Sequence, residues 1–245
     1  MPFISERDRK VLRQRFAESL QDSVKVLVFT QRKSKLVLPG NLGRSCEYCE
    51  ETRQLVEELA ELSDKIAVEV YEFSPSSPEA QGYGVDKVPA LVLLDDQGRD
   101  YGIRFFGIPA GYEFTTLVED IQDLSRHRTH LAPRTRERLQ AVKRPVHLQV
   151  FVTPTCPYCP RAVRLAHQMA MESPFLRADM VEAMEFPDLA QRYRVYGVPK
   201  VVLNEQWEFE GALPEDMFLL YVLKAADALE EGEREAFAQM RRLQG

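Results

Sequence analysis

The sequence of 245 residues is long enough for two domains of modest size, and its formal net charge is −6. This charge, without a concentrated patch of lysine and arginine, argues against binding to nucleic acid or to an anionic membrane. The apolar fraction of 44% suits a globular protein, and no apolar run approaches the roughly 20 residues of a membrane helix. The N-terminus becomes charged at Glu6 without the apolar stretch of a secretory signal, so we expect a cytoplasmic protein.

In the first half of the chain, helical and strand patterns alternate. Ser5 is the expected N-cap of a helix that runs to about Leu20, and the apolar run at 24–29 predicts a buried strand. A helix that opens at the Cys46 pair carries apolar residues at helical spacing. The elements expected after it are a strand at 66–73, a short helix at 78–83, a strand at 90–94, a turn at 95–98, a strand at 101–106 and a helix at 112–125.

The second half of the chain predicts the same order of elements. We expect a helix at 135–142, strands at 146–152, 180–184, 200–203 and 207–210, a helix after Cys156, a short helix at 188–193 and a last helix from Glu215. Beyond Leu229 the sequence is rich in glutamate and arginine, which predicts a solvated helical extension. The stretch 126–134 breaks the apolar periodicity, so we place the domains at 1–127 and 128–245.

An internal repeat relates these two halves. A single shift of 110 positions aligns both members of the first cysteine pair with those of the second, and it aligns five further residues as well. The aligned pairs are Cys46/Cys156, Tyr48/Tyr158, Cys49/Cys159, Tyr83/Tyr193, Val85/Val195, Val88/Val198 and Pro89/Pro199. Duplication of one domain explains this pattern better than coincidence does.

The four cysteines form two Cys-x-x-Cys pairs, Cys46/Cys49 and Cys156/Cys159. A helix N-terminus stabilises a thiolate, so the first cysteine of each pair is the expected nucleophile on a substrate disulfide. The second cysteine lies one helical turn further on and can displace the product thiol from the resulting mixed disulfide. We therefore predict that Cys46 and Cys156 attack and that Cys49 and Cys159 resolve.

The residues between the cysteines differ in the two copies. Glu47 places a carboxylate beside Cys46 and should disfavour its thiolate, whereas Pro157 fixes φ at a helix start. We therefore hypothesise that the Cys156 pair is the more oxidising and the more reactive of the two. The first copy also has 12 extra residues before its cysteines, within 31–45, which we interpret as an exposed loop or as a lid or docking element over the first site.

Pro89 and Pro199 each precede an apolar run that predicts a strand, where proline is unfavourable. A cis Val-Pro bond in a turn explains both positions, and such a turn can bring its backbone beside the cysteines.

With these motifs the sequence resembles the thioredoxin fold, and its tandem form closely resembles the glutaredoxin-like protein disulfide oxidoreductases of thermophilic archaea and bacteria. The strongest segments are 106–111, 151–160, 179–183 and 198–200. The resemblance implies an α/β protein of two tandem thioredoxin-like folds, each a central mixed β-sheet flanked by helices. The long insertion departs from the family pattern and leaves substrate access at the first site in question.

The resemblance also implies a function: reduction, oxidation and isomerisation of protein disulfides, as part of electron transport and cell redox homeostasis. It implies cis-prolines at Pro89 and Pro199 and substrate contacts at Val88 and Val198. Further expected contacts are Tyr48, Pro157 and Tyr158, although both tyrosines can equally pack beside the cysteines. The redox cysteines need no cofactor or metal. We expect disulfide-containing proteins as substrates, a thioredoxin-reductase-like flavoprotein as electron donor, and a peroxiredoxin as a further partner.

Three other functions compete with this one. A four-thiolate zinc site usually separates its cysteine pairs by about 15–20 residues, and these pairs are 110 apart, which disfavours structural zinc. The four histidines do not recur between the copies, which favours solvated or core roles over metal binding. A glutathione-dependent glutaredoxin stays open, because Cys-Pro-Tyr-Cys is typical of that group. An electron-relay module for a larger reductase or peroxidase also stays open.

Overall fold

The first helix of the computed structural model, α1 (Glu6–Ser19), begins where the sequence predicts. The hydroxyl of Ser5 accepts the backbone N–H of Asp8, which supplies one of the hydrogen bonds that a helix start lacks. Leu12 and Phe16 of this helix are buried. The structure describes residues 2–32 and 46–244, and within them no helix has the length and apolar character to cross a membrane.

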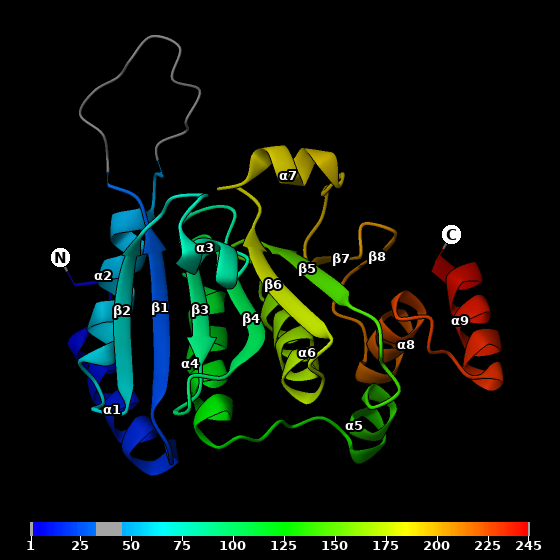
Figure 1. Ribbon diagram of the computed structural model, residues 1–245, viewed down its shortest axis with the longest axis horizontal. Coiled ribbons are helices and arrows are strands. Elements are labelled where there is room, and N and C mark those ends of the chain that lie inside the picture. Colours follow the sequence, from blue (N-terminus) through cyan, green and yellow to red (C-terminus); the bar gives the residue numbers. More distant parts are fainter. Residues whose placement is uncertain (1, 33–45, 245) are drawn as a thin grey trace, which may run out of the picture. The chain divides into compact units, whose positions relative to one another are not determined.

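In the first copy, four strands form a mixed sheet in the order β2-β1-β3-β4 (Figure 1). The parallel pair β1 (Val24–Thr30) and β2 (Ile66–Glu72) needs a crossover, and α2 (Cys49–Ala60) supplies it. The strands β3 (Ala90–Leu94) and β4 (Asp100–Phe106) pair antiparallel, and β3 is buried along its whole length. The short helix α3 (Pro78–Gly82) and the helix α4 (Tyr112–Ser125) complete the predicted order.

The second copy repeats this arrangement with strand order β6-β5-β7-β8. After α5 (Pro133–Leu139), the parallel strands β5 (Val146–Val152) and β6 (Leu176–Glu182) are joined through α6 (Cys159–Glu172). The antiparallel strands are β7 (Lys200–Leu203) and β8 (Trp207–Glu210), and the remaining helices are α7 (Pro187–Arg192), α8 (Glu215–Ala225) and α9 (Glu231–Gln244). Both copies are therefore a mixed sheet flanked by helices, as expected.

The division into two compact units does not follow a single cut of the chain. The second unit contains residues from Thr129 onward and also Tyr101–Ile103 and Gly111–Thr116, whereas the cut expected from the sequence lies at 127/128. Gly111 shows why its segment belongs to the second unit. A Cβ there would lie 2.2 Å from the carbonyl oxygen of Pro154, and the next residue, Tyr112, donates its N–H to that oxygen at 3.1 Å. Gly111 has φ +61°, so both space and backbone conformation call for glycine.

Two expectations about the second copy are wrong in part. The strand β6 begins at Leu176 instead of at 180. Its polar residues fit into the strand because they pair with each other: Arg177 Nε lies 2.9 Å from Asp179 Oδ1. The helix α9 is not wholly solvated. Phe237 is buried with its ring centroid 5.1 Å from that of Tyr221, and Glu233 forms an ion pair with Arg138 at 2.7 Å.

Candidate active site

The second cysteine pair lies at the N-terminus of α6. Cys159 is the first residue of the helix and fully buried, and Cys156 precedes it with 8% of its surface exposed. The N–H of Cys156 donates to the carbonyl oxygen of Thr153 at 3.1 Å, which closes the turn that leads from β5 into the helix. Pro160 occupies the first turn, where its missing N–H costs no helical hydrogen bond. The more accessible sulfur therefore belongs to the predicted nucleophile.

The environment of Cys159 keeps that thiol protonated. Burial is the main cause that raises its pKa, and a hydrogen bond with Cys156 adds to the effect. The Cys159 S–H thus donates to the Cys156 sulfur, which is the arrangement needed if Cys156 reacts as the thiolate and Cys159 follows as the resolving thiol. The backbone N–H of Thr153 acts in the opposite direction and lowers the pKa of Cys159.

Glu113 is a third member of this site, and the sequence analysis missed it. It lies in the first turn of α4, within the segment that belongs to the second unit, and only 2% of its surface is exposed. Its Oε2 accepts the hydroxyl of Thr116 at 2.7 Å, and its charge contributes to the raised pKa of Cys159. Because Glu113 comes 43 residues before Cys156 and from the first copy, no local motif connects it with the cysteines.

The first cysteine pair has the same location on α2, and it is a disulfide. The Cα atoms of Cys46 and Cys49 are 5.5 Å apart, within the normal range for a disulfide. The N–H of Gln31 donates to Cys49 Sγ at 3.1 Å, and the hydroxyl of Thr30 donates to the carbonyl oxygen of Cys49 at 3.4 Å. Cys156 and Cys159 are free thiols, so the chain contains one bridged and one open pair. The predicted lid or docking loop falls on residues 33–45, which lie outside the described part of the chain.

Each copy also has a Val-Pro turn, and both Val88–Pro89 and Val198–Pro199 are cis. In the second copy, Cys156 Sγ lies 3.7 Å from the carbonyl oxygen of Val198, so this turn does bring its backbone beside the nucleophile. Val88 and Val198 are half-buried and both prolines are buried.

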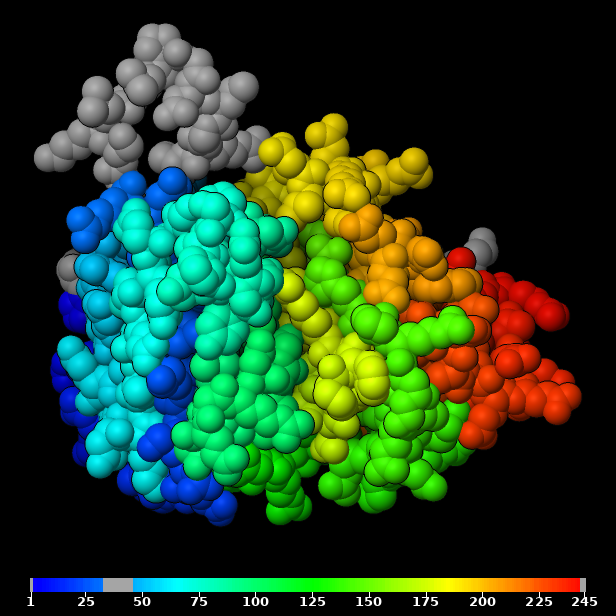
Figure 2. Space-filling view, viewed as in Figure 1, coloured from blue at the N-terminus to red at the C-terminus, as the bar shows by residue number. Residues whose placement is uncertain are grey.

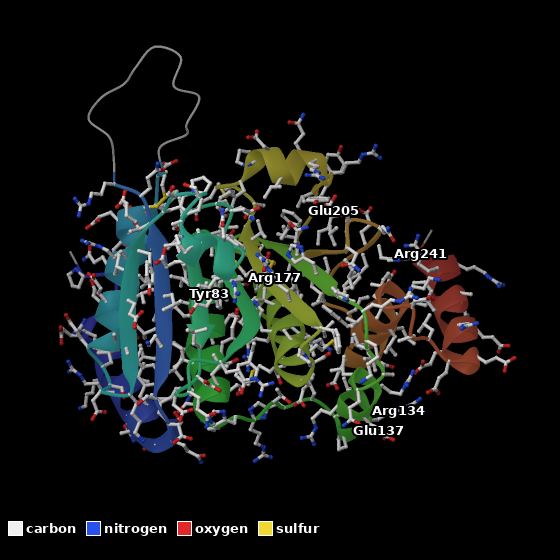
Figure 3. The ribbon with its side chains drawn as sticks, viewed as in Figure 1. Tyr83, Arg134, Glu137, Arg177, Glu205 and Arg241 are labelled. Carbon is white, nitrogen blue, oxygen red and sulfur yellow. A yellow bond between two sulfur atoms is a disulfide. The ribbon has the colours of Figure 1, made fainter. Side chains whose placement is uncertain are left out.

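A buried cation holds the segment before each cis-proline. Lys200 donates to the carbonyl oxygen of Arg194 at 3.3 Å, and in the first copy Arg104 donates to the carbonyl oxygen of Tyr83 at 3.0 Å. Tyr83 is labelled in Figure 3. Lys200 and Arg104 are each only 3% exposed. Neither cation was singled out from the sequence, although Lys200 directly follows the Val-Pro motif.

The remaining predicted contact residues differ in accessibility. Tyr158 is 70% exposed and Pro157 is exposed, so both can meet a partner, whereas Tyr48 is 38% exposed. Tyr193 packs against Phe151 with ring centroids 5.6 Å apart, and Tyr83 packs against Phe29 at 6.3 Å. These two repeated tyrosines therefore support the core beneath each site.

One group of side chains away from the cysteines has the composition of a metal site. Asp95, Asp96 and His127 each offer one ligand atom within 4.8 Å of the others. His127 Nε2 lies 3.2 Å from Asp96 Oδ1 and 3.5 Å from Asp22 Oδ2, which ion pairing alone explains. His147 Nε2 forms a hydrogen bond with Asp179 Oδ2 at 2.6 Å, and His167 is buried in α6. The absence of a cofactor or metal from the cysteine chemistry stays a prediction.

Two segments of the sequence, residues 40–124 and 146–224, each match the thioredoxin domain. The chain belongs to the thioredoxin-domain family. A protein disulfide oxidoreductase from Aeropyrum pernix K1 is 36% identical, with a TM-score of 0.80 over 91% of this chain and 94% of that one. Each copy has one Cys-x-x-Cys pair at the N-terminus of a helix, α2 or α6, and this thioredoxin-domain chain is a thiol–disulfide oxidoreductase. The tandem architecture expected from the sequence is confirmed.

Larger redox proteins contain a similar region. The NTD_N/C domain of the alkyl hydroperoxide reductase AhpF of Enterococcus faecalis matches 91% of this thioredoxin-domain chain with 25% identity and a TM-score of 0.78, and the match covers 100% of that domain. A protein named NADH dehydrogenase in Bacillus subtilis is 26% identical over 75% of this chain. A component of the alkyl hydroperoxide reductase of Pseudomonas aeruginosa is 24% identical over 83% of it. This chain covers only 33% and 38% of those two proteins.

Proposed function

We propose that this protein relays electrons from a thioredoxin-reductase-like flavoprotein to disulfides of other proteins, a peroxiredoxin among them, and that the Cys156 pair makes the exchange with the substrate. The proposal rests on one observation: within this pair Cys156 keeps 8% of its surface exposed, whereas Cys159 is fully buried and its pKa is raised, so this thiol stays protonated. That arrangement is what a dithiol mechanism requires.

The exchange has two steps, and electrons and protons balance in each. The Cys156 thiolate attacks one sulfur of the substrate disulfide, so a Cys156–substrate bond forms, the substrate S–S bond breaks, and the leaving thiolate takes a proton from solvent. Cys159 then loses its proton to a base and attacks Cys156 Sγ, so the Cys156–Cys159 bond forms and the Cys156–substrate bond breaks. The second substrate thiolate leaves and takes up a proton from solvent. The substrate gains two electrons and two protons, and the Cys156–Cys159 disulfide is the oxidised product.

Glu113 fits the second step as the proton acceptor. Its carboxylate is buried and close enough to influence the pKa of Cys159, and a buried base works without solvent access to the thiol. As the proton moves from Cys159 to Glu113, the repulsion between the developing thiolate and the carboxylate disappears. A substrate chain would then lie along the cis-proline turn, which is supported by the 3.7 Å distance between the carbonyl oxygen of Val198 and Cys156 Sγ.

The relay is supported by the names of the relatives, an alkyl hydroperoxide reductase component and an NADH dehydrogenase, of which this chain matches about a third. A reconstituted chain of NADPH, a bacterial thioredoxin reductase, this protein, a two-cysteine peroxiredoxin and hydrogen peroxide tests it. We expect consumption of NADPH that requires this protein and is lost in the double variant Cys156→Ser/Cys159→Ser. The relay is wrong if the intact protein reduces insulin with dithiothreitol yet carries no electrons in this mixture.

A further inference from the structure

The second active site is bordered by exposed apolar side chains. Tyr196, Met184 and Tyr158 are 90%, 74% and 70% exposed, which makes them the three most exposed large hydrophobic side chains of the described residues. Isolated exposed apolar residues are common on proteins, but three large ones in segments that adjoin one active site point to an interaction surface.

All three side chains are connected to Cys156 through short stretches of backbone. Tyr158 lies between the two cysteines, and Tyr196 comes two residues before Val198, whose carbonyl oxygen is 3.7 Å from Cys156 Sγ. Met184 follows the end of β6, where Ala183 donates to the carbonyl oxygen of Val152, the last residue of β5, at 3.0 Å. In Figure 2 the segment around α7, which follows Met184, projects from the surface in yellow.

The turn that carries Met184 is held by a buried carboxylate. Glu182, 3% exposed, accepts the N–H of Glu185 at 2.6 Å and also that of Met184. The segment before Tyr196 is held by the hydrogen bond from Lys200 to the carbonyl oxygen of Arg194. Because the backbone of both segments is held, binding has to order the side chains of Met184 and Tyr196 but not the backbone that carries them.

Two of the three matching positions of the first copy, 110 residues earlier, have a different chemistry, whereas Tyr158 corresponds to another tyrosine, Tyr48. Met184 corresponds to Ser74 and Tyr196 to Asp86, so the first site has a polar and an acidic residue where the second is apolar. The side chain of Asp86 is 74% exposed, and its Oδ1 lies 2.6 Å from Lys87 Nζ in an ion pair.

The charges differ in the same way. The exposed Arg161, in the first turn of α6, corresponds to Glu51 in the first turn of α2, and the exposed Arg194 corresponds to Gly84. The exposed Arg192 is already paired with Glu205 at 2.8 Å, a residue labelled in Figure 3. The second site therefore offers an apolar centre with the exposed Arg161 and Arg194 near it. The first site has Glu51 in place of Arg161, and the Asp86–Lys87 ion pair begins at the position that corresponds to Tyr196.

We infer that Tyr158, Met184 and Tyr196 form a docking surface for one class of partner: a protein segment that has apolar side chains beside its disulfide and acidic residues around them. The apolar side chains pack on these three residues, and the acidic residues face Arg161 and Arg194. The first site lacks two of the three apolar side chains and both arginines, so the two sites of one chain accept different partners. This inference rests on the proposed exchange at Cys156.

Two synthetic peptides test the inference with full-length protein in which Cys46 and Cys49 are serine. Each peptide carries one cysteine in a mixed disulfide with a chromogenic thiol. One peptide has leucine and phenylalanine beside the cysteine and glutamate further out, and the other has serine and lysine at these positions. The reaction of the reduced protein with each peptide and with a small symmetrical disulfide is followed by stopped flow.

We expect the apolar, acidic peptide to react at least about fivefold faster than the other, and added salt to reduce that advantage. The exchange of two residues for their first-copy counterparts, Met184→Ser/Tyr196→Asp, should remove the advantage and leave the rate with the small disulfide within about twofold. The control Val11→Ser, an exposed valine on α1, should change neither rate. Equal rates for the two peptides with the starting protein would overturn the docking surface alone. A protein that fails to react with the small disulfide would overturn the proposed exchange, and the docking inference with it.

Discussion

The negative charge of the Glu113 carboxylate helps to raise the pKa of the Cys159 thiol, although the two residues belong to different halves of the sequence. Burial is the larger cause of the raised pKa of Cys159, and the charge of Glu113 adds to it. This relationship supports the proposal that Glu113 accepts the proton of Cys159 in the resolving step. At the helix start of the first pair, the described acidic residues Glu50 and Glu51 lie in the first turn of α2.

Replacement of Glu113 by glutamine should have two opposite effects. The pKa of Cys159 should fall, because a negative charge near the thiol is lost, but it should stay above its usual range because burial is the main cause. Resolution of the mixed disulfide should nevertheless slow by at least about tenfold, since the proton acceptor is gone. Thiolate absorbance against pH and single-turnover release of the product thiol measure the two effects. Glu119→Gln, a half-exposed position on the same helix, is the matched control. Unchanged resolution in Glu113→Gln would remove this residue from the mechanism.

The two pairs should have different reduction potentials. The first turn of α2 contains Glu50 and Glu51, which disfavour a thiolate at Cys46, whereas the first turn of α6 contains no acidic residue. A stabilised thiolate favours the reduced form, so we expect the Cys156 pair to be the more oxidising by about 30 mV or more, which corresponds to roughly 1.4 kcal/mol.

Titration in glutathione redox buffers of two double variants, Cys46→Ser/Cys49→Ser and Cys156→Ser/Cys159→Ser, measures each potential separately. The change Glu51→Arg, which introduces the residue of the second copy, should raise the potential of the first pair. Equal potentials in the two double variants would contradict the predicted inequality.

Asp179 should make the stability of the second unit dependent on acid pH. Although its burial favours the neutral form, the hydrogen bond from His147 and the charge of Arg177 hold the pKa of Asp179 at about 2 instead of 3.8. A depressed carboxyl pKa contributes stability above pH 3.8, which is lost as the pH falls to about 2.

The variant Asp179→Asn should therefore lower the free energy of unfolding by about 2 kcal/mol at neutral pH, and the difference should shrink through that acid range. Chemical denaturation at several pH values measures it. Glu205→Gln breaks an exposed ion pair with Arg192 and should cost less than about 0.5 kcal/mol. A loss for Asp179→Asn that does not change with pH would show that the charge is not responsible.

The sequence predicts most of the fold because its signals are local and agree with one another. The strands β5, β7 and β8 have the predicted limits, since each is an apolar or alternating run bounded by proline, glycine or a turn. The start of β6 was missed because Arg177 and Asp179 look like loop residues until their ion pair is seen. The contact face of α9 was missed in a similar way, because Phe237 stands among charged residues.

The reacting atoms of the site were predictable and their surroundings were not. The cysteine spacing at a helix start identifies attacking and resolving thiols, and the repeat identifies two separate sites. The charge of Glu113 affects a cysteine distant in the sequence, so no local motif contains this residue. Lys200 lies within the segment 198–200, but the sequence does not show that its side chain bonds to the carbonyl oxygen of Arg194. Likewise, the exposure of Met184 and Tyr196 depends on how their turns leave the sheet.

The most direct test of the account is to trap the mixed disulfide. Cys159→Ser protein is mixed with oxidised insulin, quenched with acid and examined by mass spectrometry of its peptides. We predict a covalent complex joined through Cys156, and none at this pair in the variant Cys156→Ser, because Cys159 is buried and protonated. The account is contradicted if Cys159→Ser forms no complex through Cys156, or if Cys156→Ser forms one through Cys159 at the same rate.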